Sequence, residues 1–171
     1  MMTLIIGGAG SGKSEFAETI LQRSPGPHLY IATMLPFDEE SLRRIERHRA
    51  LRAGKGFEAL ECYTNLEKAA ERLSFNGGIL LECLGTLLAN EFFRPEGGGK
   101  QAVLSGIGAL RKKCSELIIV TNEVFSGGTD YEGDTLLWMT ELAGINRMLA
   151  EDAGRVIETV CGCPNILKGQ L

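Results

Sequence analysis

Short apolar segments and longer segments of mixed character alternate along this chain. Residues 3–6 are apolar and stop at a pair of glycines, and from Lys13 onward apolar side chains recur at helical spacing. The same patterns predict further strands at 28–33, 57–62, 79–81, 117–121 and, as the last strand, 155–160. They predict helices at 38–52, 66–73, 101–114 and 134–151, and a short apolar helix that ends at residue 93. Asp38 is the expected N-cap of the second helix, and Thr64 or Asn65 that of the third.

Most of the predicted strands are continuous apolar runs that do not alternate with polar residues. Such runs are typical of strands covered on both faces, and the helices between them indicate right-handed crossovers. A chain of 171 residues has the size of one domain with one core. We therefore predict an α/β three-layer sandwich with a mostly parallel sheet, formed as a single domain over residues 1–171.

The loop between the first strand and the first helix matches the pattern G-x-x-x-x-G-K-[ST] in full. Its glycines allow backbone N–H groups to surround a phosphate chain at a helix N-terminus. The lysine can reach the β- and γ-phosphates, and the serine hydroxyl can bind Mg²⁺. This P-loop predicts a nucleotide site formed by Gly7, Gly8, Ala9, Gly10, Ser11, Gly12, Lys13 and Ser14.

A P-loop enzyme also needs an acidic residue at the end of a nearby buried strand to help hold the metal ion. Two residues qualify, because Glu82 ends one apolar run and Glu123 follows another. We favour Glu82 and leave Glu123 as the alternative. The pair Ser14 and Glu82 is thus the expected Mg²⁺ site, with water molecules completing the shell.

The predicted helix at 38–52 holds five arginines, with His48 among them. Arginines lower the pKa of a neighbouring imidazole and favour its neutral, nucleophilic form, and they also attract a triphosphate. A solvated helix face is the usual explanation of such a charge run, so both a catalytic and a surface role for His48 remain open. The other histidine, His28, stands at the start of a strand and is expected to be structural.

Composition narrows the function classes. The chain has 18 basic and 22 acidic residues, a formal net charge of −4, so no basic field exists to hold a nucleic acid. No apolar run reaches the ~18 residues of a membrane span, and no secretory leader is evident. We therefore expect a cytoplasmic protein.

The five cysteines are odd in number and mostly lie beside apolar runs, which predicts reduced core thiols. Cys161 and Cys163 form a Cys-x-Cys pair, for which a metal or redox role is the alternative. Zinc needs about four ligands, and no further ligands lie nearby in the sequence.

Several motifs together resemble the bifunctional adenosylcobinamide kinase and adenosylcobinamide-phosphate guanylyltransferase family of cobalamin biosynthesis. The resemblance extends over nearly the whole chain. Its motifs are Gly7-Gly8-Ala9-x-Ser11-Gly12-Lys13-Ser14, Tyr30-Ile31-Ala32-Thr33, Arg44-Ile45 with His48 and Arg52, Glu61, Leu80-Leu81-Glu82-Cys83-Leu84, Val120-Thr121-Asn122-Glu123-Val124, and Asn146 with Leu149-Ala150.

The resemblance implies a RecA-like fold, a homotrimer and two reactions on a corrinoid substrate. A nucleoside triphosphate, ATP or GTP, phosphorylates adenosylcobinamide, with Lys13 and Mg²⁺ assisting. His48 then takes GMP from GTP as a phosphoramidate and passes it on to give adenosylcobinamide-GDP. The implied nucleotide site comprises the P-loop with Ala32, Thr33, Met34, Arg49, Ala50, Leu51, Arg52, Glu61 and Glu82.

The sequence also departs from the family pattern in two places. Arg52 is followed by Ala53 where the family has proline, and Phe57 lies one position later than the family's tryptophan. After Val124 the glycine-rich segment of the family is replaced by residues 125–130. Further on, apolar or neutral side chains stand where charged ones are expected, at Leu136, Met139 and Thr140.

Two other functions remain open at this point. A simple P-loop kinase would transfer a γ-phosphate and never use His48. A non-catalytic relative would bind nucleotide or corrinoid without turnover, which the lost charged residues after Val124 favour.

Overall fold

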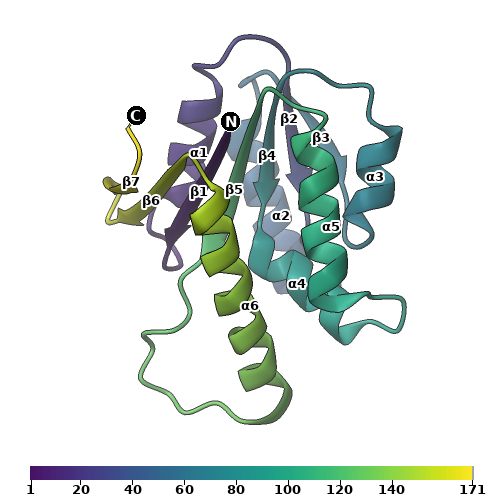
Figure 1. Ribbon diagram of the computed structural model, residues 1–171, viewed down its shortest axis with the longest axis vertical. Helices are drawn as coiled ribbons and strands as arrows, with labels where there is room; N and C mark the ends of the chain where they lie inside the picture. The colour runs from purple at the N-terminus through teal and green to yellow at the C-terminus, as the bar shows by residue number, and fades with distance from the viewer. Residues whose placement is uncertain (171) are drawn as a thin grey trace.

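The computed structural model describes residues 1–170 and contains one seven-stranded sheet flanked by six helices (Figure 1). Within that range the strands are β1 Met2–Gly7, β2 His28–Ala32, β3 Phe57–Glu61, β4 Gly78–Glu82, β5 Glu116–Asn122, β6 Arg155–Val160 and β7 Cys163–Lys168. The helices are α1 Lys13–Leu21, α2 Glu39–Arg52, α3 Leu66–Arg72, α4 Leu84–Phe93, α5 Gly99–Arg111 and α6 Gly133–Asp152.

The strand order is β3-β2-β4-β5-β1-β6-β7, and every neighbouring pair except β6 and β7 is parallel. The predicted α/β sandwich with a mostly parallel sheet is therefore confirmed. All parallel strands end at the same edge of the sheet, and the loops that follow them gather there. Strand β5 lies between β1 and β4, so the strand that ends at Glu82 does not pair with the P-loop strand.

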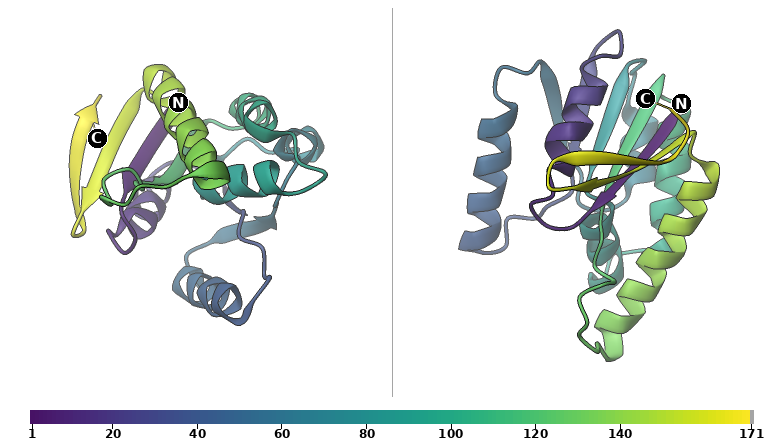
Figure 2. Two further views of the ribbon diagram at one scale, coloured as in Figure 1. Left: turned by 90° about the horizontal axis from the view of Figure 1, so that it is seen from below. Right: turned by 90° about the vertical axis from the view of Figure 1, so that its left-hand side faces the viewer.

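Two hydrophobic clusters lie on the two faces of the sheet. One joins helices α3, α4, α5 and α6 to the sheet through fully buried side chains such as Leu87 and Leu142. The other joins only helix α1 to the opposite face, through Ala17, Ile20 and Leu21. Helix α2 stands apart from the sheet in both views of Figure 2, and its one buried residue is Ser41.

The strand predicted at 155–160 is β6, and it is followed by a further strand, β7. Strand β7 pairs antiparallel with β6 through a two-residue turn at Cys161 and Gly162, which have φ angles of 51° and 78°. Positive φ at both central positions is typical of hairpin turns that match the twist of the strands. No hydrophobic pattern predicts this strand, because its side chains are all exposed and form no continuous apolar run.

The cysteine prediction is correct for part of the chain. Cys62 and Cys83 are buried, Cys114 is half-buried, and all five thiols are free. Burial raises the pKa of Cys62 to about 11, so this thiol is not a nucleophile near neutral pH. Cys161 and Cys163 are exposed, which corrects the expectation of core thiols: they lie on the hairpin that the sequence did not reveal.

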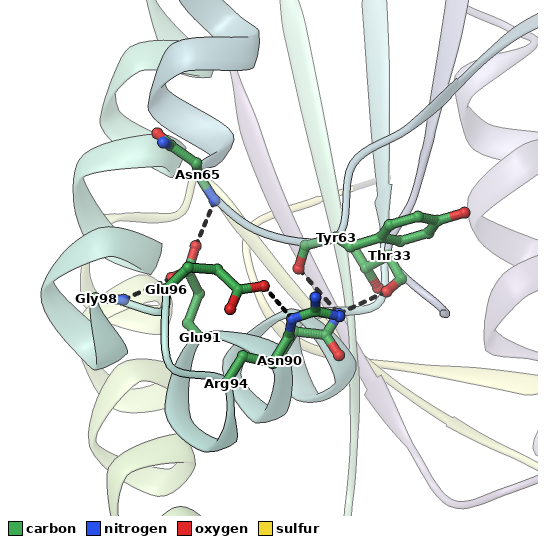
Figure 3. A network of polar contacts seen from close by, with 8 residues as sticks. All are labelled: Thr33, Tyr63, Asn65, Asn90, Glu91, Arg94, Glu96 and Gly98. Carbon is green, nitrogen blue, oxygen red and sulfur yellow. Dashed lines mark hydrogen bonds and ion pairs between the residues drawn. The ribbon is translucent and has the colours of Figure 1, made fainter. Parts of the chain in front are cut away.

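Helix α4 organises the loops around it through two adjacent polar residues (Figure 3). The Asn90 amide donates to the carbonyl oxygens of Thr33 at 2.8 Å and Tyr63 at 2.9 Å. The buried Glu91 carboxylate accepts the backbone N–H groups of Asn65 at 2.6 Å and Gly98 at 2.8 Å. Of the two residues expected at the N-cap of α3, Asn65 occupies the position. Its side chain forms no capping hydrogen bond.

Within residues 1–170, no helix is long and apolar enough to cross a membrane.

The remaining helix ends differ from prediction by a few residues, as for α5, which begins at Gly99 and ends at Arg111. Both ends of α5 lie in segments without strong cap signals.

Candidate active site

The P-loop connects strand β1 to helix α1 and turns sharply at two glycines. Gly10 and Gly12 have φ angles of 71° and 88°, which L side chains rarely adopt. Gly12 is also the N-cap of α1, so the free N–H groups of the first helical turn face the loop. Gly162 on the C-terminal hairpin donates its N–H to the Ser11 carbonyl at 2.9 Å and supports the loop from outside.

Lys13 and Ser14 begin helix α1 and point toward the loop and the sheet. The Lys13 ammonium donates to the Gly8 carbonyl at 2.8 Å and is almost fully buried. Burial lowers the pKa of Lys13, and the nearby Glu82 carboxylate partly opposes this. The Ser14 hydroxyl donates a hydrogen bond to Oε1 of Glu82. The P-loop and the end of β4 are therefore in direct contact.

The structure distinguishes the two acidic candidates. Glu123 uses its carboxylate on its own loop, where it accepts from the Phe125 N–H at 2.8 Å and from the Ser126 N–H and hydroxyl at 3.2 and 2.6 Å. Glu82 faces the P-loop, and burial raises its pKa to about 7 although Ser14 and Lys13 oppose the shift. Only Glu82 reaches the position that a metal-binding acid would need.

The residues around Ser14 fit a magnesium ion. Oε2 of Glu82 is buried and has no hydrogen-bond partner, so one carboxylate oxygen is unused beside the serine hydroxyl. Mg²⁺ prefers oxygen ligands and usually takes one or two from the protein and the rest from water and phosphates. In the part of the chain that the structure describes, no group of three or more His, Cys, Asp or Glu forms a denser metal site.

Helix α2 is stabilised at its ends rather than by packing. Asp38 and Ser41 form a capping box, in which the Ser41 N–H donates to Asp38 at 2.6 Å and the Asp38 N–H donates to Ser41 at 3.0 Å. Glu39 and Glu40 lie in the first turn, and Arg49 and Arg52 in the last, an order that suits the helix dipole. The predicted N-cap at Asp38 is confirmed.

His48 lies half-buried on α2 and faces a cavity of about 670 Å³ between this helix and the P-loop. Burial lowers the pKa of His48, and the positive charges of Arg52, Arg44, Arg47 and Lys13 lower it further, in that order. The neutral imidazole therefore predominates at neutral pH. The proposed influence of the arginines on His48 is thus present in the folded protein.

The C-terminal half of α2 is tied to the sheet edge by two contacts. The Arg52 guanidinium stacks over the Tyr30 ring at 3.6 Å from its centroid. Arg49 forms an ion pair with Glu61, whose other oxygen accepts from the Tyr63 hydroxyl at 2.7 Å. Both bonds lower the pKa of Glu61. These contacts hold the helix over the mouth of the cavity.

The sequence matches the family model described as cobinamide kinase / cobinamide phosphate guanyltransferase over residues 3–167. The chain belongs to this family. It is therefore a P-loop enzyme of cobalamin biosynthesis with kinase and guanylyltransferase activities.

Curated relatives cover almost the whole chain. The bifunctional adenosylcobalamin biosynthesis protein CobU of Escherichia coli K12 is 34% identical over 179 residues, covering 95% of this chain and 97% of the relative. CobP of Pseudomonas aeruginosa is 33% identical and covers 99% of both chains.

Solved structures support the fold alone. A Pyrococcus horikoshii protein has a TM-score of 0.57 at 12% identity, covering 99% of this chain and 87% of its own. A prototypical ATPase of a bacterial type III secretion system has a TM-score of 0.51 at 14% identity, covering 92% and 50%.

Most residues that the family resemblance implied do line the cavity. The lining includes Ala9, Gly10, Ser11, Gly12, Lys13, Ser14, Ala32, Met34, His48, Arg49, Leu51, Arg52, Glu61 and Glu82. Gly7, Gly8, Thr33 and Ala50 are not among the lining residues. Thr33 is fully buried behind the site, where its hydroxyl lies 3.0 Å from the carbonyl oxygens of Glu82 and Cys83, can donate to either, and accepts the Cys83 N–H. It supports the strand end that carries Glu82.

The cavity has further walls that sequence reasoning did not assign. Glu18 and Lys55 form an ion pair of 2.5 Å at one side, and Arg44 and Asn122 also line the space. Glu18 lies four residues after Ser14, about one helical turn along α1. This spacing could have placed Glu18 on the same side of the helix as Ser14. Lys55 follows α2 in a glycine-flanked loop, and nothing in its local pattern indicates this contact.

The segment in which the chain departs from its family forms a second cavity, of about 510 Å³. Phe125, Leu136, Met139 and Thr140 line it, together with Ile6, Ala143, Asn146 and Arg147. Four of the replaced positions after Val124, namely Phe125, Leu136, Met139 and Thr140, therefore lie in the lining of this one cavity, which is mostly apolar.

Proposed function

We propose that this enzyme phosphorylates adenosylcobinamide with a nucleoside triphosphate and then transfers GMP from GTP to the new phosphate through a guanylated His48. The observation that carries the proposal is that His48, with a lowered pKa, faces the same cavity as the P-loop. A helix of five arginines and one histidine over a phosphate-binding loop suits both phosphoryl and nucleotidyl transfer.

In the kinase step the P-loop backbone, Lys13 and the nearby arginines hold the triphosphate and offset its charge. The terminal hydroxyl of the aminopropanol arm attacks the γ-phosphorus, the bond to the bridging oxygen of the nucleoside diphosphate breaks, and the hydroxyl proton is released to water. Ser14 and Glu82 would hold Mg²⁺, which neutralises phosphate charge when bound. The buried positive charge of Lys13 favours an anionic ligand at the same position.

In the transfer step a neutral ring nitrogen of His48 attacks the α-phosphorus of GTP. A P–N bond forms, the P–O bond to pyrophosphate breaks, and the arginines of α2 stabilise the charge on both products. The phosphate oxygen of the acceptor then attacks the same phosphorus. The P–N bond breaks, His48 is regenerated, and adenosylcobinamide-GDP leaves.

The nucleotide site that we propose comprises the P-loop residues 9–14 with Ala32, Met34, Arg49, Leu51, Arg52, Glu61 and Glu82. Gly7, Gly8, Thr33 and Ala50 act from behind or beside this lining. Both ATP and GTP fit the phosphate-binding part, so either is a candidate donor for the kinase step.

We also propose that the protein works in the cytoplasm as a homotrimer. The support for both is the family likeness over residues 3–167. Light scattering of the purified protein measures its mass in solution, and a monomer at working concentration contradicts the trimer.

The decisive experiment is to incubate the protein with α-labelled GTP and Mg²⁺, denature it, and look for bound label. We expect an acid-labile, base-stable label that His48→Ala removes while γ-phosphate transfer to cobinamide persists in part. His28→Ala is the matched control, because His28 is the only other histidine and lies at the start of β2.

Absence of label in protein that binds GTP contradicts the histidine step and leaves the simple kinase. Absence of label together with absence of γ-phosphate transfer leaves the non-catalytic relative. Label that survives in the His48→Ala variant places the nucleophile elsewhere.

A further inference from the structure

The turn between β6 and β7 carries two thiols that the proposed function does not use. Cys161 and Gly162 are the two residues of this turn, and Cys163 begins β7. The thiols of Cys161 and Cys163 are free and exposed, whereas those of Cys62 and Cys83 are buried. Strand β7 is the edge of the sheet, and all of its side chains are exposed. Small reagents therefore reach both thiols of the turn.

This turn also supports the P-loop. The Gly162 N–H donates to the Ser11 carbonyl oxygen at 2.9 Å. A side chain on Gly12 would place its Cβ 3.1 Å from the Gly162 Cα, so the two backbones pack closely. Thr159 of β6 is buried, and its hydroxyl oxygen lies 3.1 Å from that of Ser11. Figure 2 shows the hairpin beside the loop that joins β1 to α1. A change in the turn is therefore transmitted to the phosphate-binding loop.

One residue separates the two cysteines, and that residue is Gly162. Cα atoms two positions apart in a chain are at most about 7 Å apart, and disulfides join Cα atoms separated by about 4.4–6.8 Å. A bond between Cys161 and Cys163 therefore closes a small ring that contains both peptide groups of Gly162. Glycine permits such a ring, because it adopts backbone angles that other residues rarely reach. Closing the ring changes the backbone angles that direct the Gly162 N–H toward Ser11.

We propose that Cys161 and Cys163 form a redox-sensitive modification site. Low-molecular-weight disulfides convert the two thiols to a Cys161–Cys163 disulfide, and this bond weakens nucleotide binding by withdrawing the Gly162 N–H from the P-loop. The inference needs the P-loop to bind a nucleotide and is independent of the histidine step. Oxidation and nucleotide binding are thus coupled, and each opposes the other.

The oxidation takes place by two thiol–disulfide exchanges. The sulfur of one cysteine, after losing its proton, attacks a sulfur of the reagent, so a mixed disulfide forms and one reagent thiolate leaves. The sulfur of the second cysteine then attacks the protein sulfur of the mixed disulfide. The Cys161–Cys163 bond forms and the second reagent thiolate leaves. The two reagent thiolates take up the two protons that the cysteines lost. The protein loses two electrons, and the reagent gains them.

The first measurement identifies the bond. The protein is equilibrated with oxidised glutathione, the remaining thiols are alkylated, and mass spectrometry locates the alkyl groups. We expect Cys161 and Cys163 to escape alkylation together, in a peptide lighter by two hydrogens than its dithiol form. Cys114→Ser, which removes a half-buried thiol, is the matched control and should leave this result unchanged. A disulfide between two copies of the chain, oxidation confined to other cysteines, or no oxidation overturns the proposal.

The second measurement follows GTP binding by titration calorimetry. We expect oxidised wild-type protein to bind GTP about three- to tenfold more weakly than reduced protein, because one hydrogen bond to the P-loop is lost. The double variant Cys161→Ser/Cys163→Ser cannot form the bond, so oxidised glutathione should not change its affinity. Both replaced side chains are exposed, so this variant should fold with an unchanged Tm. Unchanged affinity in fully oxidised wild-type protein overturns the coupling. An equal loss in Cys161→Ser alone, where only a mixed disulfide can form, overturns the ring.

The coupling also acts in the opposite direction. By linkage, saturating GTP shifts the ratio of disulfide to dithiol in a glutathione buffer toward the dithiol, by the same factor as the change in GTP affinity. A shift toward the disulfide, or no shift, contradicts the coupling.

Failure of the proposed function gives a different result. Protein that binds GTP but takes no label on His48 contradicts the histidine step and leaves the redox site intact. Protein that takes the label equally well in its oxidised and reduced forms, with equal GTP affinity, contradicts only the redox site.

Discussion

The two faces of the sheet are covered very differently. Helices α3, α4, α5 and α6 pack on one face, and their apolar side chains are fully buried between helix and sheet. The other face has helix α1 alone, with α2 standing away from it (Figure 2). The polar residues of the P-loop cavity lie on the thinly covered side. Stability and chemistry are thus separated, because a helix that is not packed leaves room for a nucleotide.

The largest loss of activity should come from replacing Lys13, which lies on the thinly covered face. Lys13→Ala removes the buried cation at the P-loop, so we expect both the kinase rate and the GMP labelling to fall by about 10²- to 10³-fold. Steady-state transfer assays with cobinamide and single-turnover labelling with GTP measure the two. Full activity in Lys13→Ala would show that the arginines of α2 alone hold the triphosphate.

The thickly covered face should dominate stability. Leu87→Ala empties a fully buried position on α4, and we expect the free energy of unfolding to fall by about 2–5 kcal/mol. The control is Leu51→Ala on α2, which is 56% exposed and should change stability by less than about 0.5 kcal/mol. Urea denaturation followed by circular dichroism measures both. Similar losses in the two variants would contradict the separation of the faces.

Asn90 connects the thickly covered face of the sheet to the loops that lead toward α2. Asn90 on α4 holds the loop that leaves β2 toward α2 and the loop that leaves β3 (Figure 3). Asn90→Ala leaves two carbonyl groups without their donor, and we expect a loss of about 1–3 kcal/mol in the free energy of unfolding. Asn90→Asp keeps the size but cannot donate, so it should be no better than alanine. Wild-type stability in the aspartate variant would disprove the role of the two bonds.

The smallest effect concerns the charge around His48. The neutral imidazole is the nucleophile, and since its pKa is lowered, labelling should persist below the ordinary pKa of histidine near 6.5. Arg44→Gln removes one positive charge, which raises the pKa of His48 and moves the acid limb of the labelling rate to higher pH by less than about one unit. The rate at pH 6 should therefore fall.

Arg43→Gln is the matched control for this pH profile. Arg43 pairs with Glu39 at the start of α2 and is not among the neighbouring charges that lower the pKa of His48. If both variants shift the acid limb equally, the shift comes from the overall charge of the helix rather than from the neighbours of the imidazole.

Much of the candidate site could be predicted from local patterns. The P-loop can be predicted from its motif alone, because a phosphate-binding loop needs glycines with positive φ and a following lysine at fixed spacing. The capping box at Asp38 and Ser41 is equally local. His48 and its arginines are neighbours along one helix, so their mutual influence follows from helical spacing alone.

Other parts depended on contacts between residues far apart in the sequence. Glu82 and Glu123 have similar local patterns, and only the strand order and the turn after β5 show that Glu82 meets Ser14 while Glu123 binds its own loop. Strand β7 forms because β6 offers it an edge, which its exposed side chains could not reveal.

The sequence by itself determined the order of the six helices and of the six strands before β7, the phosphate-binding loop and the histidine among arginines. These features follow from backbone preferences and from the fixed spacing of side chains along one element. The tertiary structure decided which acid faces the P-loop, which cysteines are exposed, and that the buried side chains of Asn146 and Thr121 have no hydrogen-bond partner within residues 1–170. Such facts depend on which surfaces come together, because burial and pairing are properties of two segments and not of one.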